Sequence, residues 1–217
     1  MQQDKSMMMI SNPCIQAVVE TPWYEGEPLW PWSVADYKPF SHIQLYDEMT
    51  DLEVGLIFAQ LVQYNDLENG DNANDVLYRA IESETLILPG GLQVKSTANE
   101  LIYPGCCCGL EEWREWLDFL TTERSPWLGH DPSPWFEMVD GFVRIWSDGG
   151  MDSAASGFHI DFEQSTFETE LSRVQQDLST FLVKIEAWAN GIEFPEPRKL
   201  SSKFDKCFAI SRKWPEE

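Results

Sequence analysis

Residues 166–190, TFETELSRVQQDLSTFLVKIEAWAN, are the stretch that decides the fold. Their apolar side chains recur at helical spacing and form one stripe over about seven turns. The members of that stripe are Phe167, Leu171, Val174, Leu178, Phe181, Leu182, Ile185 and Trp188. Residues 165–168 match a capping box ahead of the stripe, and Gly191 is placed to end it. The pattern predicts a long amphipathic helix near 166–190.

Short strand-like segments with turn residues between them accompany this helix. Residues 85–88 and 92–95 flank a Pro-Gly-Gly sequence, which predicts two strands joined by a turn, and residues 100–103 are a further strand candidate. Asp140-Gly141 supplies the positive φ values of a type I′ turn, so we expect residues 136–146 to form a hairpin. The sequence therefore predicts an α+β fold, with a small antiparallel sheet of hairpins packed against helices.

Four further segments show helical patterns. Residues 52–64 are apolar enough to be buried and fit a strand or a helix, of which we expect the helix. Residues 75–83 carry one apolar face behind Asn and Asp capping residues, and residues 109–122 place Leu and Trp side chains at helical spacing. The basic segment 199–213 is a candidate for a short closing helix.

The 217 residues predict one folded domain, since 43% of them are apolar and they include 12 Phe, 10 Trp and 6 Tyr. Residues 22–39 interleave Trp and Tyr with Pro, which favours an ordered loop. No apolar run is long enough for a membrane span or a signal segment, so we expect no membrane association. Five cysteines, three of them adjacent, do not resemble a disulfide framework and favour a reducing cytoplasm.

The chain is strongly acidic, with 15 Lys and Arg against 37 Asp and Glu and a net charge of −22. Residues 1–194 carry −24, whereas the segment 195–217 is mildly basic at +2. Such a charge repels phosphate backbones and attracts basic partners, so we expect no nucleic acid and a basic protein as partner. Two other interpretations stay open: an acidic surface that serves solubility alone, and a module that recognises a basic peptide. The sequence carries no signal for an oligomeric state.

Cys106, Cys107 and Cys108 stand between a strand-like segment and the 109–122 helix. A helix N-terminus lowers the pKa of a thiol, which would favour a reactive thiolate, but Glu111 and Glu112 oppose that effect. Small thiols often pack as core, and burial is the first interpretation. Adjacent cysteines are poorly spaced for one tetrahedral ion, so we expect no metal or other cofactor at this run.

Two histidines have an acidic neighbour: Asp131 follows His130, and Asp161 lies two residues beyond His159. His130 and Asp131 join Cys106, Cys107 and Cys108 as candidate catalytic residues. His159 and Asp161 would share one face of a strand over 158–162, where they could hold a metal if Asp148 converged on them. An ordinary surface pair is the alternative. The sequence lacks the phosphate-binding loop, the dinucleotide glycine motif, the zinc-protease motif and the nucleophile elbow.

The loop 126–135 packs Trp127, Trp135, three Pro and the His130-Asp131 pair into ten residues. Tryptophan is enriched both at binding hot spots and in loops anchored on a core. We therefore consider Trp127 and Trp135, together with Glu111 and Glu112, as candidate partner-binding residues.

Residues 88–148, with LPGGL, YPGCCCGLEEWREWLDFL, PWLGHDPSPW and a hairpin ending VRIWSD, resemble small bacterial proteins of the toxin-immunity type. The resemblance implies a cytoplasmic protein that binds and blocks a cognate toxin, and it carries no site residues. The first functional prediction is thus a non-enzymatic protein that binds a basic partner. The alternative is a metal-dependent or thiol enzyme that uses His159, Asp161 and Asp148, or the Cys106–Cys108 run.

Overall fold

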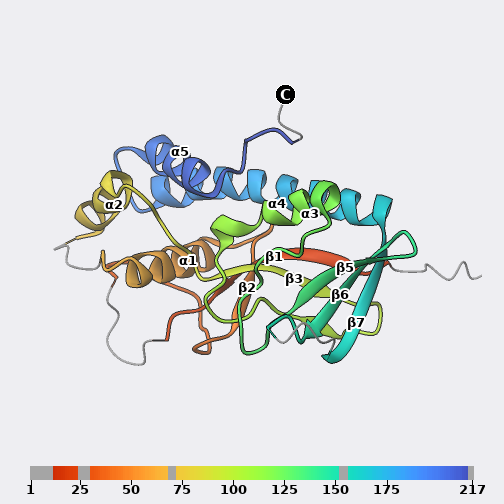
Figure 1. Cartoon of the computed structure of the whole chain (residues 1–217). Coiled ribbons are helices and arrows are strands. Elements are labelled where there is room, and N and C mark those ends of the chain that lie inside the picture. Colours follow the sequence, from red (N-terminus) through yellow and green to blue (C-terminus); the bar gives the residue numbers. More distant parts are fainter. Residues whose placement is uncertain (1–11, 24–29, 68–71, 152–155, 215–217) are drawn as a thin grey trace, which may run out of the picture.

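The computed structural model describes residues 12–23, 30–67, 72–151 and 156–214 and has an α+β fold (Figure 1). The helices are α1 (Asp51–Tyr64), α2 (Ala73–Glu82), α3 (Glu115–Thr122), α4 (Gln164–Gly191) and α5 (Pro197–Phe208), with a 3-10 turn η1 (Leu110–Glu112). The strands are β1 (Cys14–Glu20), β2 (His42–Gln44), β3 (Gly90–Lys95), β4 (Leu101–Ile102), β5 (Trp135–Val139), β6 (Phe142–Asp148) and β7 (Ser156–Glu163). None of the helices within these ranges combines the length and the apolar character that crossing a bilayer requires.

The strands form two antiparallel sheets. One has the order β2-β1-β3-β4, and the other has the order β5-β6-β7. Helices α4 and α5 run along one side of the molecule and both sheets lie on the other, with α1 beside the four-stranded sheet (Figure 1). One cluster of buried side chains runs through the described residues from Ile15 to Ile210.

Helix α4 confirms the long amphipathic helix, and its apolar stripe is buried. Phe167 sits at the centre of an aromatic cluster, with its ring 5.7 to 6.2 Å from the rings of Trp116, Phe136 and Phe162. The predicted capping box at residues 165–168 is wrong. Because Glu163 is still paired with Phe142 in the sheet, β7 passes into α4 without a loop and leaves no position for a side-chain cap.

Several other predicted elements are confirmed. Helices α1 and α2 match the predicted segments to within two residues, whereas α5 ends at Phe208 and leaves residues 209–213 of the predicted closing helix outside it. Asn72 caps α2 by accepting from the backbone N–H of Asp75 at 3.2 Å. The hairpin β5-β6 turns at Asp140 (φ 50°) and Gly141 (φ 82°), as a type I′ turn requires. Within the described part of residues 22–39, which leaves out 24–29, the chain forms no helix or strand. Of the basic segment 195–217, residues 215–217 lie outside the described ranges.

The predicted hairpin across residues 85–95 is wrong. Residues 85–88 are not a strand, because Ile87 bonds to the Asn65 side chain and Leu88 bonds to the loop at Leu110. Gly90 and Gly91 belong to β3 rather than to a turn. A Cβ at Gly90 would overlap the carbonyl oxygen of Val18, so glycine permits the close pairing of β3 with β1.

The predicted continuous helix over residues 109–122 is divided into η1 and α3. Trp113 lies at the division, almost fully buried, and its Nε1 donates to the carbonyl oxygen of Phe208 at 2.8 Å. That bond ties the segment to the end of α5, and the backbone passes Trp113 with tight i to i+3 bonds instead of regular α-helical ones.

Candidate functional site

Two loops meet at the surface to form the candidate site. Cys106 and His130 exchange two backbone hydrogen bonds, of 2.8 and 3.1 Å, and Gly105 donates to the carbonyl oxygen of Leu128 at 2.7 Å. A Cβ at Gly129 would lie 2.5 Å from the carbonyl carbon of Gly105, and a Cβ at Gly105 would overlap Pro132. Glycine at both positions therefore allows the loops to touch.

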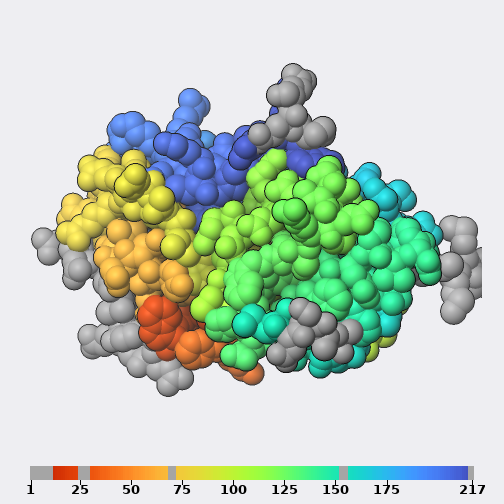
Figure 2. All heavy atoms as spheres, in the orientation of Figure 1, coloured from red at the N-terminus to blue at the C-terminus, as the bar shows by residue number. Residues whose placement is uncertain are grey.

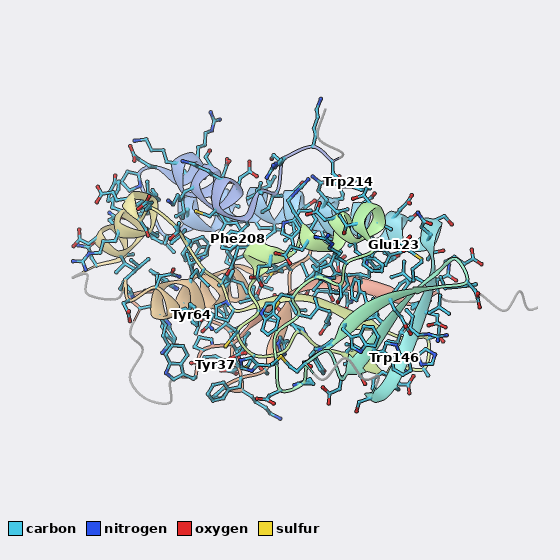
Figure 3. The ribbon with its side chains drawn as sticks, viewed as in Figure 1. Tyr37, Tyr64, Glu123, Trp146, Phe208 and Trp214 are labelled. Atoms are coloured by element: carbon cyan, nitrogen blue, oxygen red, sulfur yellow. The ribbon has the colours of Figure 1, made fainter. Side chains whose placement is uncertain are left out.

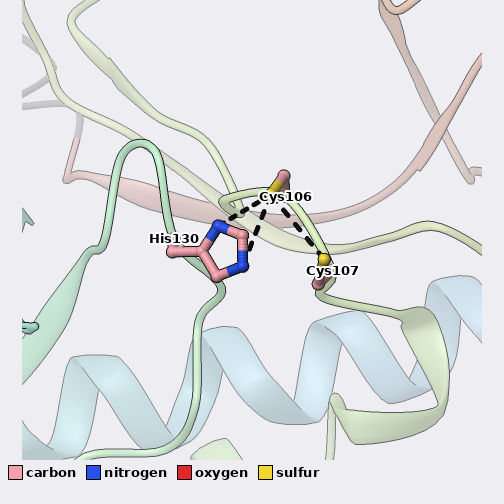
Figure 4. Close-up of side chains that lie close together, drawn as sticks. All are labelled: Cys106, Cys107 and His130. Atoms are coloured by element: carbon pink, nitrogen blue, oxygen red, sulfur yellow. Dashed lines mark hydrogen bonds between the residues drawn. The ribbon is translucent and has the colours of Figure 1, made fainter.

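This contact brings the predicted candidates Cys106, Cys107 and His130 together (Figure 4). The Cys106 Sγ lies 2.8 Å from His130 Nδ1, 3.8 Å from His130 Nε2 and 3.7 Å from the Cys107 Sγ. Both thiols are exposed, and Cys107 has a positive φ of 67°. Asp131 joins the group, with Oδ2 3.6 Å from His130 Nδ1 and a side chain that is 95% exposed.

The third cysteine behaves differently from its neighbours. Cys108 is buried, and burial together with the nearby Glu112 and Glu111 raises the pKa of its thiol to about 12. The expected burial of the run thus holds for Cys108 and is wrong for Cys106 and Cys107, whose turn faces solvent. The hypothesis of a thiol activated by a helix N-terminus is wrong for Cys108, the cysteine nearest to η1, because the pKa of this thiol is raised rather than lowered.

Glu111 and Glu112 are half-buried rather than part of an open surface. Glu111 accepts from the backbone N–H of Leu88 at 3.2 Å, and burial raises the pKa of both carboxyl groups. They help to fix the loop around Cys108, so we assign them no contact with a partner.

The electrostatic surroundings of Cys106 are acidic. Desolvation by the loops, the hydrogen bond with Cys107 and the carboxylates of Asp131 and Glu20 together raise the pKa of its thiol. The hydrogen bond to His130 therefore does not make Cys106 a preformed thiolate nucleophile. The same carboxylates favour the presence of a cation.

A groove of about 570 Å³ lies next to Cys106. Asp131, Glu20, His42 and Tyr103 line it, and the His42 ring stacks on the Tyr103 ring at a centroid distance of 5.0 Å. Burial lowers the pKa of His42 and raises the pKa of Glu20. The sequence carried no signal for these two residues, since β1 and β2 place them there by pairing Glu20 with His42.

The open face of the β5-β6-β7 sheet carries a second cluster of aromatic and charged side chains. Register aligns Trp135, Trp146 and His159 in one row, with ring centroids 6.4 Å apart for the first pair and 4.6 Å for the second. The next row contains Glu137, Arg144 and Asp161. Figure 3 labels Trp146 on this sheet, and Figure 2 shows the strands of the sheet, in green to cyan, on the surface of the molecule.

The candidate metal ligands His159, Asp161 and Asp148 do not come together as a ligand group. His159 and Asp161 do share a strand face, with 3.7 Å between Nε2 and Oδ2, but Arg144 occupies both Asp161 oxygens at 2.8 and 2.9 Å. These bonds hold the pKa of Asp161 below its usual range. Asp148 accepts from the backbone N–H groups of Ser133 and Gly149, and the three side chains do not form a ligand group.

Trp127 and Trp135 line a second groove, of about 400 Å³. Trp127 is 43% exposed, and its ring centroid lies 6.1 Å from that of His130. Both tryptophans therefore present part of their surface to solvent, as hot-spot residues must.

The structure defines this chain as an α+β protein with a thiol–imidazole group beside an aromatic and acidic sheet face. No family model matches the sequence, and comparisons with curated proteins and with solved structures found no match.

Proposed function

We propose that this chain is a non-enzymatic binding protein that receives a basic segment of another protein on the open face of β5-β6-β7. The observation that supports this proposal is the row of Trp135, Trp146 and His159 beside the carboxylate of Glu137. Aromatic faces and carboxylates are the two groups that attract Arg and Lys side chains, through cation–π contacts and ion pairs.

The internal chemistry of the face gives an example of this recognition. The Arg144 guanidinium carbon lies 5.8 Å from the centre of the Trp146 ring while its nitrogens bond to Asp161. Glu137 accepts from Trp146 Nε1 at 2.8 Å, which fixes the orientation of the indole ring. A rigid, oriented aromatic ring loses little conformational entropy when a partner binds it.

The overall charge of −22 supports a basic partner, because a charge of this size steers a cationic protein toward the chain. We further propose that the partner is a basic toxin and that the chain acts as its immunity protein in the cytoplasm. The resemblance of residues 88–148 to immunity-type proteins and the five unpaired cysteines support this part of the proposal.

The binding face is tested with an arginine-rich synthetic peptide, followed by tryptophan fluorescence over a range of salt concentrations. Because any strongly acidic protein attracts a polycation, the decisive comparison is between variants. Trp146→Ala should weaken peptide binding at least about tenfold, which is the effect of a typical hot-spot residue. Val183→Ala, on the exposed side of α4, is the control and should leave the affinity unchanged. Equal affinities of the two variants would refute the assignment of this face.

The toxin partner is tested in cells. The chain is co-expressed with a basic protein encoded next to its gene, and growth and co-purification are measured. Growth rescue that is lost in Trp146→Ala supports the proposal, whereas failure of every neighbouring basic protein to bind overturns it.

A metal-dependent or thiol enzyme is the second candidate function. The observation that favours it is the 2.8 Å contact between Cys106 Sγ and His130 Nδ1 at the edge of a groove. Alkylation by iodoacetamide tests the thiol version, because a catalytic thiolate reacts rapidly at neutral pH. The raised pKa of Cys106 leads us to expect slow alkylation, and that result would exclude the thiol version of this candidate.

A further inference from the structure

We propose that Cys106, Cys107 and His130 bind a zinc ion, at a site that is distinct from the protein-binding face described above. One ligand atom from each of these residues falls within 4.8 Å of the other two. Thiolate sulfur and imidazole nitrogen are the ligands that zinc prefers in proteins. Hard cations such as magnesium and calcium select oxygen ligands and do not suit this group.

The sulfur spacing matches a tetrahedral ion. Two thiolates that each lie about 2.3 Å from zinc at the tetrahedral angle are about 3.8 Å apart, and a thiolate and an imidazole nitrogen are about 3.6 Å apart. The structure has 3.7 Å between the Cys106 and Cys107 sulfurs and 2.8 Å between Cys106 Sγ and His130 Nδ1, the ring nitrogen that faces this sulfur. The two sulfurs therefore stand close to their bound positions, and the His130 ring moves away from Cys106 by about 0.8 Å as the ion enters.

The local backbone explains how adjacent cysteines can share one ion. In an extended chain, successive side chains point in opposite directions, which is why the sequence alone disfavours such a pair. Cys107 instead adopts a left-handed conformation, with φ of 67°, and this turn places its sulfur on the same side as that of Cys106. The paired loops then bring His130 to the third position.

Asp131 supplies the outer part of the site. Its Oδ2 lies 3.6 Å from His130 Nδ1, beyond hydrogen-bond distance, so Asp131 contributes the electrostatic attraction of a nearby carboxylate rather than a ligand. The negative charges of Asp131 and Glu20 also offset the charge of a divalent cation.

Three protein ligands leave one position of a tetrahedral ion open. In proteins this arrangement is typical of sites where the fourth position takes water or a small ligand, and closed structural sites use four side chains. Cys106 and Asp131 both border the groove that contains His42 and Glu20. A molecule in this groove is thus placed to reach the open position.

The test is metal binding by the full chain, purified without a metal-affinity tag and kept under a phosphine reductant. Cobalt(II) is titrated as a spectroscopic probe, and elemental analysis measures zinc after dialysis. We expect one ion per chain, a thiolate-to-cobalt charge-transfer band, and displacement of cobalt by zinc. Circular dichroism of each variant confirms that it folds.

Matched variants assign the ligands. Cys106→Ser, Cys107→Ser and His130→Ala should each weaken binding by more than the roughly 10–100-fold that loss of an outer partner costs, and Asp131→Asn should weaken it less. Cys207→Ser removes the same residue type elsewhere and should bind the ion normally. Absence of the charge-transfer band under reducing conditions, or binding that survives the Cys106 and His130 changes, overturns the proposal. Peptide binding by the Trp146 face is a separate readout, so the two proposals fail independently.

Discussion

The contact between the two site loops depends on Gly129, and its replacement by alanine is the most informative single change. Gly129 and Gly141 have nearly the same positive φ, 85° and 82°. A Cβ at Gly141 would meet no heavy atom within 4 Å, whereas at Gly129 it would lie 2.5 Å from the carbonyl carbon of Gly105. Gly141→Ala is therefore a control with the same backbone penalty and no steric one.

The structure allows the two costs to be separated. Alanine in a left-handed conformation destabilises the folded state by about 1–2 kcal/mol. Because alanine also lowers the conformational entropy of the unfolded chain, about 0.4–1 kcal/mol of this cost is offset. Gly141→Ala should therefore lower the free energy of unfolding by about 1 kcal/mol. Gly129→Ala must also push the loops apart and break the two backbone bonds between Cys106 and His130, each worth about 1 kcal/mol. We expect a total loss of about 3 kcal/mol.

The assay is urea unfolding followed by tryptophan fluorescence, with the free energy extrapolated to water. The two variants should differ by about 2 kcal/mol with unchanged urea dependence, and Gly129→Ala alone should lose the cobalt charge-transfer band. Equal destabilisation by the two changes would refute the argument that the Gly105 and Gly129 contact assembles the site.

Three further predictions concern the core, a buried hydrogen bond and acid stability. Phe167→Ala should cost about 3–5 kcal/mol in urea unfolding, because the ring is fully buried, whereas Val183→Ala on the exposed side of α4 should change the free energy little. Trp113→Phe should cost about 1–3 kcal/mol, because a buried carbonyl of α5 loses its donor; a smaller loss would show that the bond does not hold the end of α5. Arg144→Met should lower the free energy of unfolding only slightly at neutral pH, since the ion pair is partly exposed. The depressed pKa of Asp161 makes this contribution present above the unfolded carboxyl pKa, near 3.9, and absent once the pH falls below the folded value. Stability curves of wild type and Arg144→Met should thus converge in acid, and parallel curves would contradict the assignment.

Local patterns in the sequence determined the elements whose stability is local. The stripe in α4, the Asn72 cap of α2 and the Asp140-Gly141 turn each depend on residues a few positions apart, so period and turn chemistry predicted them. The central strand β1 had no such signal, because its partners β2 and β3 lie far along the chain.

The candidate site illustrates the same division. The sequence singled out Cys106, Cys107, His130 and Asp131 as chemically capable residues, because their thiol, imidazole and carboxylate groups are evident from residue identity. Their convergence required the loop pairing that Gly105 and Gly129 permit and the left-handed turn at Cys107.

Tertiary structure also decided which candidates do not act. Arg144 pairs with Asp161, Cys108 is buried, and Glu111 accepts a hydrogen bond from the backbone of Leu88. The physical reason is that ligand geometry depends on distances of a few ångströms between distant segments, and residue identity and spacing along the chain do not encode those distances.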